Sequence, residues 1–188
     1  MRAHIDTEKY LQEFSQQRSG AFYTVVREGL YAESYPLYTA FFDPGSPRSE
    51  VCIPHDGSGP GIAWVKREEL GEGTAELIKR YVEHPNAFEY LNSTVLLSGP
   101  KVLTLAETVA ALGKLANTPV TIREVSEDEY AKQPQNSAGF TYKDVDYSLP
   151  WVSSFEAFRR GEGSFVSPLL EQLLGRKPAD FEATIGIK

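Results

Sequence analysis

The chain has 188 residues, of which 41% are hydrophobic and 24% charged, and its formal charge at pH 7 is −7. This composition is ordinary for one folded domain and excludes a disordered, collagenous or coiled-coil chain. It also excludes nucleic-acid binding through a basic surface, which depends on Lys and Arg neutralising phosphates.

No apolar stretch of the sequence approaches the ~20 residues that cross a bilayer, so we expect no membrane span. The first residues turn acidic at once and lack the apolar centre of a secretory signal. The single cysteine, Cys52, lies in an apolar run and is expected to be a buried hydrophobe rather than a reactive thiol. These features together predict a reduced, cytoplasmic protein.

The first third of the chain alternates between helical and extended patterns. An apolar stripe predicts a helix over residues 6–17, and β-branched and aromatic residues predict a strand over 21–27, buried on both faces. The aromatic-rich stretch 30–42 predicts a helix. Prolines and glycines mark 43–61 as a loop, and 62–65 predicts a short strand.

The middle of the chain repeats this alternation. Apolar residues at helical spacing predict a helix over 66–82, and a strand follows at 94–97. Residues 104–107 form a capping box that opens a helix to about residue 115. A strand is predicted over 120–125, and a second capping box at 126–129 begins a short helix.

The last part of the chain is less regular. Residues 133–150 show no clear period, 153–156 read as a third capping box, and 168–174 predict a final short helix. Strands that alternate with helices predict an α/β fold, a truncated Rossmann-like open sheet of about four strands flanked by helices. We expect a single domain with an α/β core over 1–132 and an irregular, helical C-terminal cap over 133–188.

The sequence lacks the motifs of nucleotide and metal chemistry. The glycine cluster at 57–61 is followed by a predicted strand rather than a helix, and Pro60 removes a backbone donor, so we interpret it as a loop rather than a dinucleotide site. The sequence contains no Gly-x-x-x-x-Gly-Lys-Ser/Thr, Gly-x-Ser-x-Gly or Tyr-x-x-x-Lys motif. The three histidines lie far apart in the sequence. We therefore expect neither a cofactor nor a metal ion.

An acid–base pocket is the remaining candidate site. In open α/β sheets ligands bind beyond the carboxyl ends of the strands. The first strand ends at such a point, with Tyr31 and Glu33 as candidate catalytic residues and Glu28 and Tyr38 as candidate substrate contacts. An aromatic wall raises the pKa of a nearby carboxyl group by desolvation, which suits a general acid.

Further candidates come from later segments of the chain. The dipeptide 55–56, His55 and Asp56, supplies two more titratable groups and completes the predicted catalytic set. Trp64, Tyr147 and Trp151 are predicted to contact the substrate. The competing interpretation is structural for each residue, because a Glu near a helix start stabilises the helix dipole and tyrosines at helical spacing usually pack.

The order of the segments resembles that of NmrA-like proteins, atypical members of the short-chain dehydrogenase/reductase superfamily. Each segment is a weak motif alone, and together they cover nearly the whole chain. The segments that carry the resemblance are 7–11, 22–31, 62–71, 97–104 and 173–178.

Proteins of that family begin with a Rossmann half that carries a Gly-rich dinucleotide loop, and the resemblance here begins after it. The resemblance therefore implies a C-terminal half without its own nucleotide site. The strand at 21–27 would then leave an unpaired edge, and we expect a second copy of the chain to cover it in a symmetric homodimer.

Three functions follow from these observations. The leading hypothesis is a cofactor-independent acid–base enzyme, an isomerase, cyclase or dehydratase, acting on an aromatic or polycyclic secondary metabolite, by epoxide opening or a cationic rearrangement. The first alternative is a non-enzymatic NmrA-like module that binds a partner. The second is part of an NAD(P)-dependent oxidoreductase that is completed by another chain.

Overall fold

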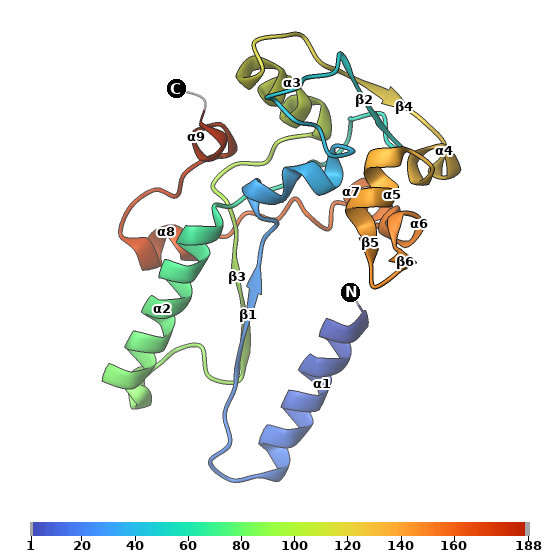
Figure 1. The fold of residues 1–188 in the computed structure, drawn as a ribbon. Coiled ribbons are helices and arrows are strands. Elements are labelled where there is room, and N and C mark those ends of the chain that lie inside the picture. The colour runs from blue at the N-terminus through green and yellow to red at the C-terminus, as the bar shows by residue number, and fades with distance from the viewer. Residues whose placement is uncertain (1, 187–188) are drawn as a thin grey trace.

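The structure is a computed structural model that describes residues 2–186. Figure 1 shows an elongated lower part, in which two strands run between two long helices, and an upper part built from short helices and strands. The chain passes between the two parts several times, so neither part is a continuous segment of the sequence.

The lower part contains two long helices and two paired strands. β1 (Thr24–Glu28) and β3 (Ser93–Leu97) pair in parallel, with Thr24 opposite Ser93 and Glu28 opposite Leu97. The helices α1 (Arg2–Gln17) and α2 (Arg67–Glu83) flank the strands, and α8 (Leu169–Leu174) packs against α2 and β3. Gly175 ends α8 in the left-handed conformation.

The upper part holds a second parallel pair and a set of short helices. β2 (Glu50–Ile53) pairs with β4 (Thr121–Glu124). The remaining elements of the described chain are η1 (Ala32–Tyr38), α3 (Leu105–Leu115), α4 (Glu127–Ala131), α5 (Pro134–Phe140), β5 (Thr141–Tyr142), β6 (Val145–Asp146), α6 (Ser148–Trp151), α7 (Ser153–Arg159) and α9 (Phe181–Ile185), with η2 (Pro85–Ala87) in the lower part.

The α/β fold predicted from the sequence is confirmed, with short parallel sheets flanked by helices. The four longer strands lie in two separate pairs, β1–β3 and β2–β4. The predicted strand at 62–65 is wrong, since this segment makes only two isolated bridges, Tyr31 to Val65 and Ile62 to Leu103. Its hydrogen-bond partner changes within two residues, so a ladder cannot propagate.

Two other local predictions were wrong for identifiable reasons. The stretch 30–42 contains only the 3-10 helix η1, because Pro36 lies inside it and lacks the donor that an α-helix needs. The predicted capping box at 153–156 does not form, since Val152 is already helical and the chain enters α7 from α6. A capping side chain needs an extended backbone to reach the helix amides.

The capping box predicted at 104–107 is confirmed, and of the box predicted at 126–129 the serine cap is observed; this geometry explains where the two helices begin. The Thr104 hydroxyl accepts from the N–H of Glu107, whose carboxylate in turn accepts from the N–H of Thr104, as a capping box requires. The Ser126 hydroxyl accepts from the N–H of Glu129 at the start of α4.

The segment 43–61, predicted to be a loop, contains the strand β2. This strand forms where apolar residues interrupt the prolines and glycines.

Two apolar clusters form the core. The larger one joins η1, β2, α3 and α5–α7 around Trp64, Tyr130 and Phe155, and the smaller one packs α2 and α8 on β3. Residues from both sides of position 132 share each cluster. The division into a core over 1–132 and a cap over 133–188 stays a prediction. Across residues 2–186, every helix is too short or too polar to cross a membrane.

Candidate functional site

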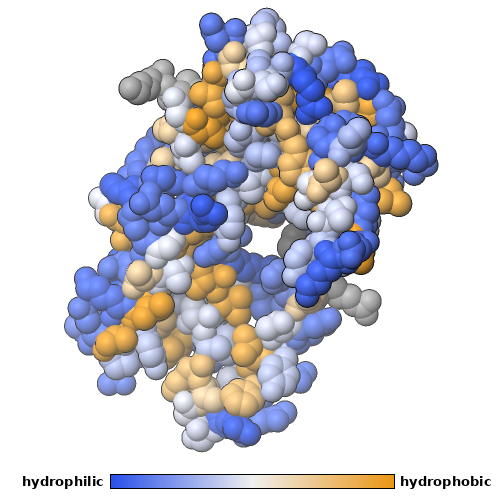
Figure 2. All heavy atoms as spheres, viewed as in Figure 1, coloured by the Kyte–Doolittle hydropathy of each residue, from blue (hydrophilic) through white to orange (hydrophobic). Residues whose placement is uncertain are grey.

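A cavity of about 830 Å³ lies at the carboxyl ends of β1 and β3, where the first pair of strands meets α1 and the chain after α7. Its volume falls within the range of small-molecule sites. Figure 2, in the view of Figure 1, shows an opening between the upper and lower parts of the molecule. The lining is mostly apolar and includes Val25, Leu30, Leu37 and Ala63.

A tyrosine–carboxylate pair lines this cavity at the end of β1. The Tyr31 hydroxyl donates to Glu28 Oε2 at 2.8 Å. This hydrogen bond is the main cause that raises the pKa of Tyr31 above its usual value, with burial and the charge of Glu28 adding to it. The tyrosine is therefore protonated at neutral pH, and its hydroxyl proton forms the hydrogen bond to the carboxylate.

Aromatic side chains form the upper wall of the cavity. Tyr38 and Phe158 both line it, with ring centroids 5.3 Å apart in an edge-on arrangement. Tyr38 is also in contact with Trp64 and Trp151, at centroid distances of 5.8 and 5.6 Å. Burial raises the pKa of Tyr38 to about 12, so this side chain is an uncharged surface for a ligand rather than an acid at neutral pH.

The other charged groups at the cavity are paired. Arg27 binds Glu8 of α1, with 2.7 Å between Arg27 Nη2 and Glu8 Oε1, and this contact connects α1 to β1. Glu162 is bound by Arg160 at 2.7 Å. Among the described contacts, the Glu28 carboxylate accepts from the Tyr31 hydroxyl and makes no ion pair.

Glu33 lies outside the cavity lining. Both of its carboxylate oxygens accept from the backbone N–H of Arg67, at 3.2 Å, and so cap the start of α2 from another segment. The residue before that helix, Lys66, makes no side-chain cap of its own. A negative charge at a helix start is stabilising, so the contacts of Glu33 fit the structural interpretation.

Three of the four aromatic residues predicted to contact the substrate lie apart from the cavity lining. Trp64 is 1% exposed, and its indole N–H donates to Thr108 Oγ1 at 3.0 Å. Trp151 is half-buried and donates to the carbonyl of Leu37. Tyr147 is exposed on the surface at the start of α6. Of the nine predicted site residues, the cavity gathers three: Glu28, Tyr31 and Tyr38.

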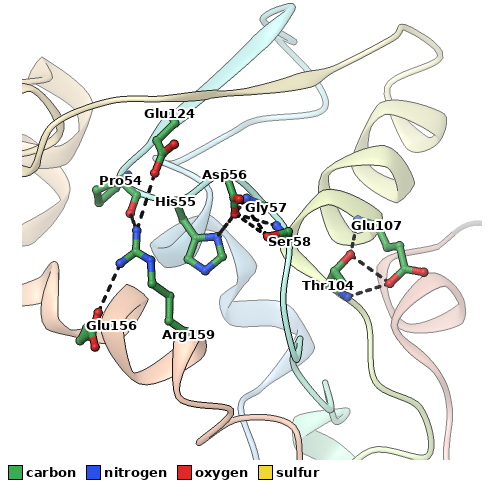
Figure 3. A network of polar contacts seen from close by, with 10 residues as sticks. All are labelled: Pro54, His55, Asp56, Gly57, Ser58, Thr104, Glu107, Glu124, Glu156 and Arg159. Atoms are coloured by element: carbon green, nitrogen blue, oxygen red, sulfur yellow. Dashed lines mark hydrogen bonds and ion pairs between the residues drawn. The ribbon is translucent and has the colours of Figure 1, made fainter.

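His55 and Asp56 lie in the loop after β2 (Figure 3). Neither residue lines the cavity. His55 Nδ1 accepts from the N–H of Gly57 at 2.9 Å, while Nε2 is buried without a partner. Asp56 is exposed, and its carboxylate accepts from the N–H and hydroxyl of Ser58, which hold its pKa below the usual value. The loop also receives Arg159, which donates to the carbonyl of Pro54.

Burial of His55 makes stability depend on pH. Desolvation, followed by the charge of Arg159, lowers the pKa of His55 below 6.5. The fold accommodates the neutral imidazole. The stability that depends on this neutral form is therefore fully present above pH 6.5 and is lost as pH falls through the lowered pKa.

We expect His55→Asn, which can still accept from Gly57 but does not titrate, to flatten the decline in unfolding free energy between about pH 7 and pH 5. The slope of the unfolding free energy against pH should fall by at most about 1.4 kcal/mol per pH unit, which is the slope that the uptake of one proton on unfolding produces. Denaturant titrations across this range measure it, with the exposed His84→Asn as the control. An unchanged slope in His55→Asn would show that the ring is not protonated on unfolding.

The described residues hold no cluster of three or more His, Cys, Asp or Glu side chains arranged for a metal ion. The loop over 57–61 turns by left-handed glycines, and its backbone leads to Ile62 rather than into a helix. That arrangement does not present a helix N-terminus to a pyrophosphate. This loop therefore lacks the geometry that holds a dinucleotide in a Rossmann turn.

The sequence analysis missed the segment after α7 that closes the cavity. Glu162, Gly163 and Phe165 all line it, and the N–H of Ala63 donates to the carbonyl of Gly163 at 2.8 Å, which holds this segment against the strand ends. Gly161, with a φ of 73°, makes the turn. The Gly-Glu-Gly-Ser run was the available signal, since such runs after a helix mark an ordered turn.

Searches of known proteins relate the chain to a group of oxidoreductases. No protein-family model matches it. An NmrA-like family domain-containing oxidoreductase of Aspergillus flavus is 33% identical over 178 residues, which are 94% of this chain and 52% of that protein. The chain therefore spans about half the length of this relative.

Solved structures agree on the fold. A NADPH-dependent quinone oxidoreductase of Escherichia coli superposes with a TM-score of 0.70 and 23% identity, covering 98% of this chain and 59% of that one. The triphenylmethane reductase of Citrobacter sp., solved with NADP(H), superposes with a TM-score of 0.64 and 20% identity, covering 94% and 56%.

Proposed function

We propose that the chain, which is similar to an NmrA-like oxidoreductase over 94% of its length, corresponds to the C-terminal half of such a protein and forms the substrate-binding part of an NAD(P)H-dependent oxidoreductase. Its substrate in this proposal is a flat aromatic electron acceptor. The two similar structures are named for a quinone and for triphenylmethane, both of which contain unsaturated six-membered carbon rings. The proposed oxidoreductase function replaces the cofactor-independent acid–base enzyme as the leading interpretation.

The cavity at the ends of β1 and β3 is the observation that carries the proposal. It is large enough for a two- or three-ring molecule, it is lined by apolar and aromatic side chains, and it lies where α/β sheets bind ligands. Flat aromatic molecules gain most from such surfaces through apolar burial and ring stacking. In the proposal Tyr38 and Phe158 contact the ligand, and Tyr31 and Glu28 orient it.

The reduced nicotinamide has to come from a nucleotide-binding part, in the same polypeptide or in another. The outer edge of β1 is unpaired within the described residues, and β1 lies beside the cavity. Exposed apolar side chains on α2 flank the same strand pair: Ile78, Tyr81 and Val82. A sheet-forming partner that paired with this edge would satisfy its backbone groups and bury these side chains.

Binding of a neutral flat aromatic molecule to the purified chain tests the proposal. We expect acridine to bind, as followed by fluorescence anisotropy, and Ala157→Trp to weaken binding at least about tenfold because the added ring occupies the cavity. Ala75→Trp, on the exposed face of α2, is the matched control and should bind as the unmodified chain does. Absence of binding, or equal binding to both variants, would contradict the proposal.

The Tyr31–Glu28 pair is the observation that favours a second candidate, the acid–base enzyme acting on an aromatic secondary metabolite. A hydroxyl held on a carboxylate inside an aromatic cavity is a proton-transfer arrangement. Glu33, His55 and Asp56, the other predicted catalytic residues, would have to act from outside this cavity. Turnover of an epoxide or isomerisable substrate that survives in Tyr31→Phe and Glu28→Gln would exclude the pair from such a role.

A homodimer and a cytoplasmic location complete the proposal. A second copy can pair with the free edge of β1 when no nucleotide-binding part occupies it, so the two partners should compete. Light scattering on the chain alone should give twice the mass of 20.9 kDa. A monomer at micromolar concentration would contradict the dimer without affecting the substrate site.

A further inference from the structure

One ion pair connects the helix α1 to the strand β1. Among the described side chains of residues 3–17, Glu8 alone makes a hydrogen bond or ion pair that reaches outside the helix. Its Oε1 atom accepts from both Nε and Nη2 of Arg27, each at 2.7 Å. The side chain of Arg27 is 30% exposed and that of Glu8 is 28% exposed, so water screens the pair only in part.

Apolar packing holds α1 only weakly. None of residues 3–17 is buried, and none of them belongs to either apolar cluster of the core. Leu11 and Phe14 are half-buried, whereas Ile5 and Tyr10 are 48% and 64% exposed. An isolated helix of this length is marginally stable in water, and most helices in proteins are stabilised by packing an apolar face. The position of α1 therefore depends on the ion pair and on the contents of the cavity beneath it.

The helix forms one wall of the cavity at the ends of β1 and β3. His4, Thr7 and Glu8 share one face of α1 and line the cavity, to which β1 also contributes. A ligand there would lie between the helix and the strand. Figure 1 shows α1 joined to β1 at the foot of the molecule, through residues 18–23. Within this turn Gly20 has a φ of 83°, and a Cβ atom there would meet nothing within 4 Å, so the turn is unpacked at this point.

We propose that α1 is a lid over the cavity, hinged at residues 18–23 and latched by the ion pair between Glu8 and Arg27. Release of the pair frees the helix from β1 and opens a route to the cavity. A flat aromatic ligand supplies the apolar surface that the rest of the fold does not give α1, so binding closes and orders the helix. Closure separates the ligand from water. This role of α1 rests on the proposed function, because it concerns how the same cavity takes up and retains its ligand.

Hydrogen exchange of the backbone amides, measured by mass spectrometry on the full chain, tests the latch without a ligand. Glu8→Arg replaces the pair by two cations and should make the α1 amides exchange about tenfold faster, because the released helix unfolds. Glu8→Arg combined with Arg27→Glu restores a pair of opposite charges and should restore slow exchange. Glu13→Arg, at an exposed position of α1, changes the net charge equally and is the matched control. The capped helix α3 is the internal reference and should exchange alike in all variants.

Acridine at saturation tests closure in the same experiment. We expect it to slow exchange in α1 at least about tenfold further in the unmodified chain, and to bind Glu8→Arg more weakly than the charge-exchanged double variant. Exchange in α1 that Glu8→Arg leaves unchanged, that Glu13→Arg speeds equally, or that the double variant does not slow again would overturn the latch. Acridine binding without added protection of α1 would overturn the lid and leave the proposed function intact. If acridine does not bind, both fail.

Discussion

Gly99→Ala should prevent the chain from folding, or lower the free energy of unfolding by more than about 4 kcal/mol. A Cβ atom at Gly99 would lie 1.6 Å from the carbonyl oxygen of Trp64 and 2.5 Å from its carbon. Both are backbone atoms, so no side chain can move aside. The exit of β3 crosses the segment 62–65 at this point, and Ser98 and Ala63, which line the cavity, would be displaced together.

Gly71→Ala is the control for this substitution. Gly71 lies inside α2, and a Cβ atom there meets nothing within 4 Å. Alanine is a better helix residue than glycine, so we expect a gain of about 0.5–1 kcal/mol. Denaturant unfolding of both variants measures the contrast. A Gly99→Ala protein as stable as the unmodified chain would contradict the close approach of Gly99 to the backbone of Trp64.

Trp64→Ala should cost about 3–5 kcal/mol of stability, the range for removing a large aromatic side chain from a core. Its ring packs against Phe181 and Tyr38, at centroid distances of 5.4 and 5.8 Å, and its indole N–H binds Thr108. The substitution leaves a cavity and removes a buried hydrogen bond. Its effect on ligand affinity should be indirect, because the indole lies behind Tyr38 rather than in the cavity lining.

Tyr147→Ala provides the comparison, because the sequence predicted that Tyr147 and Trp64 both contact the substrate. Tyr147 is 45% exposed, and we expect its removal to change stability by no more than about 0.5 kcal/mol. Thermal or denaturant unfolding of the two variants measures the difference. Similar losses in both would contradict the packing described for Trp64.

Local sequence signals located most of the elements, because helices, caps and parallel strands are determined by nearby residues. The capping box at Thr104 and the helix stop at Gly175 are examples. The segment 62–65 has a strand composition, but its partners come from three distant parts of the chain, near residues 30, 103 and 163. No local pattern encodes such a junction, so composition alone gave the wrong element.

The candidate site was predictable only where one strand end supplies it. Glu28 and Tyr31 follow β1 directly, and the rule that ligands bind beyond strand ends places them at the cavity. The opposite wall comes from α1 and from the chain after α7, whose positions depend on tertiary packing. His55 and Trp64 have residue types typical of active sites, yet the structure gives them buried packing positions.

Parallel titrations of the purified chain with acridine and with NADPH test the central claim, that this half binds the aromatic acceptor and depends on another part for the nucleotide. Calorimetry should show acridine binding that Ala157→Trp weakens, and no tight binding of NADPH, because a glycine-rich loop leading into a helix is absent from the sequence. Tight, stoichiometric binding of NADPH together with no binding of acridine would contradict the account.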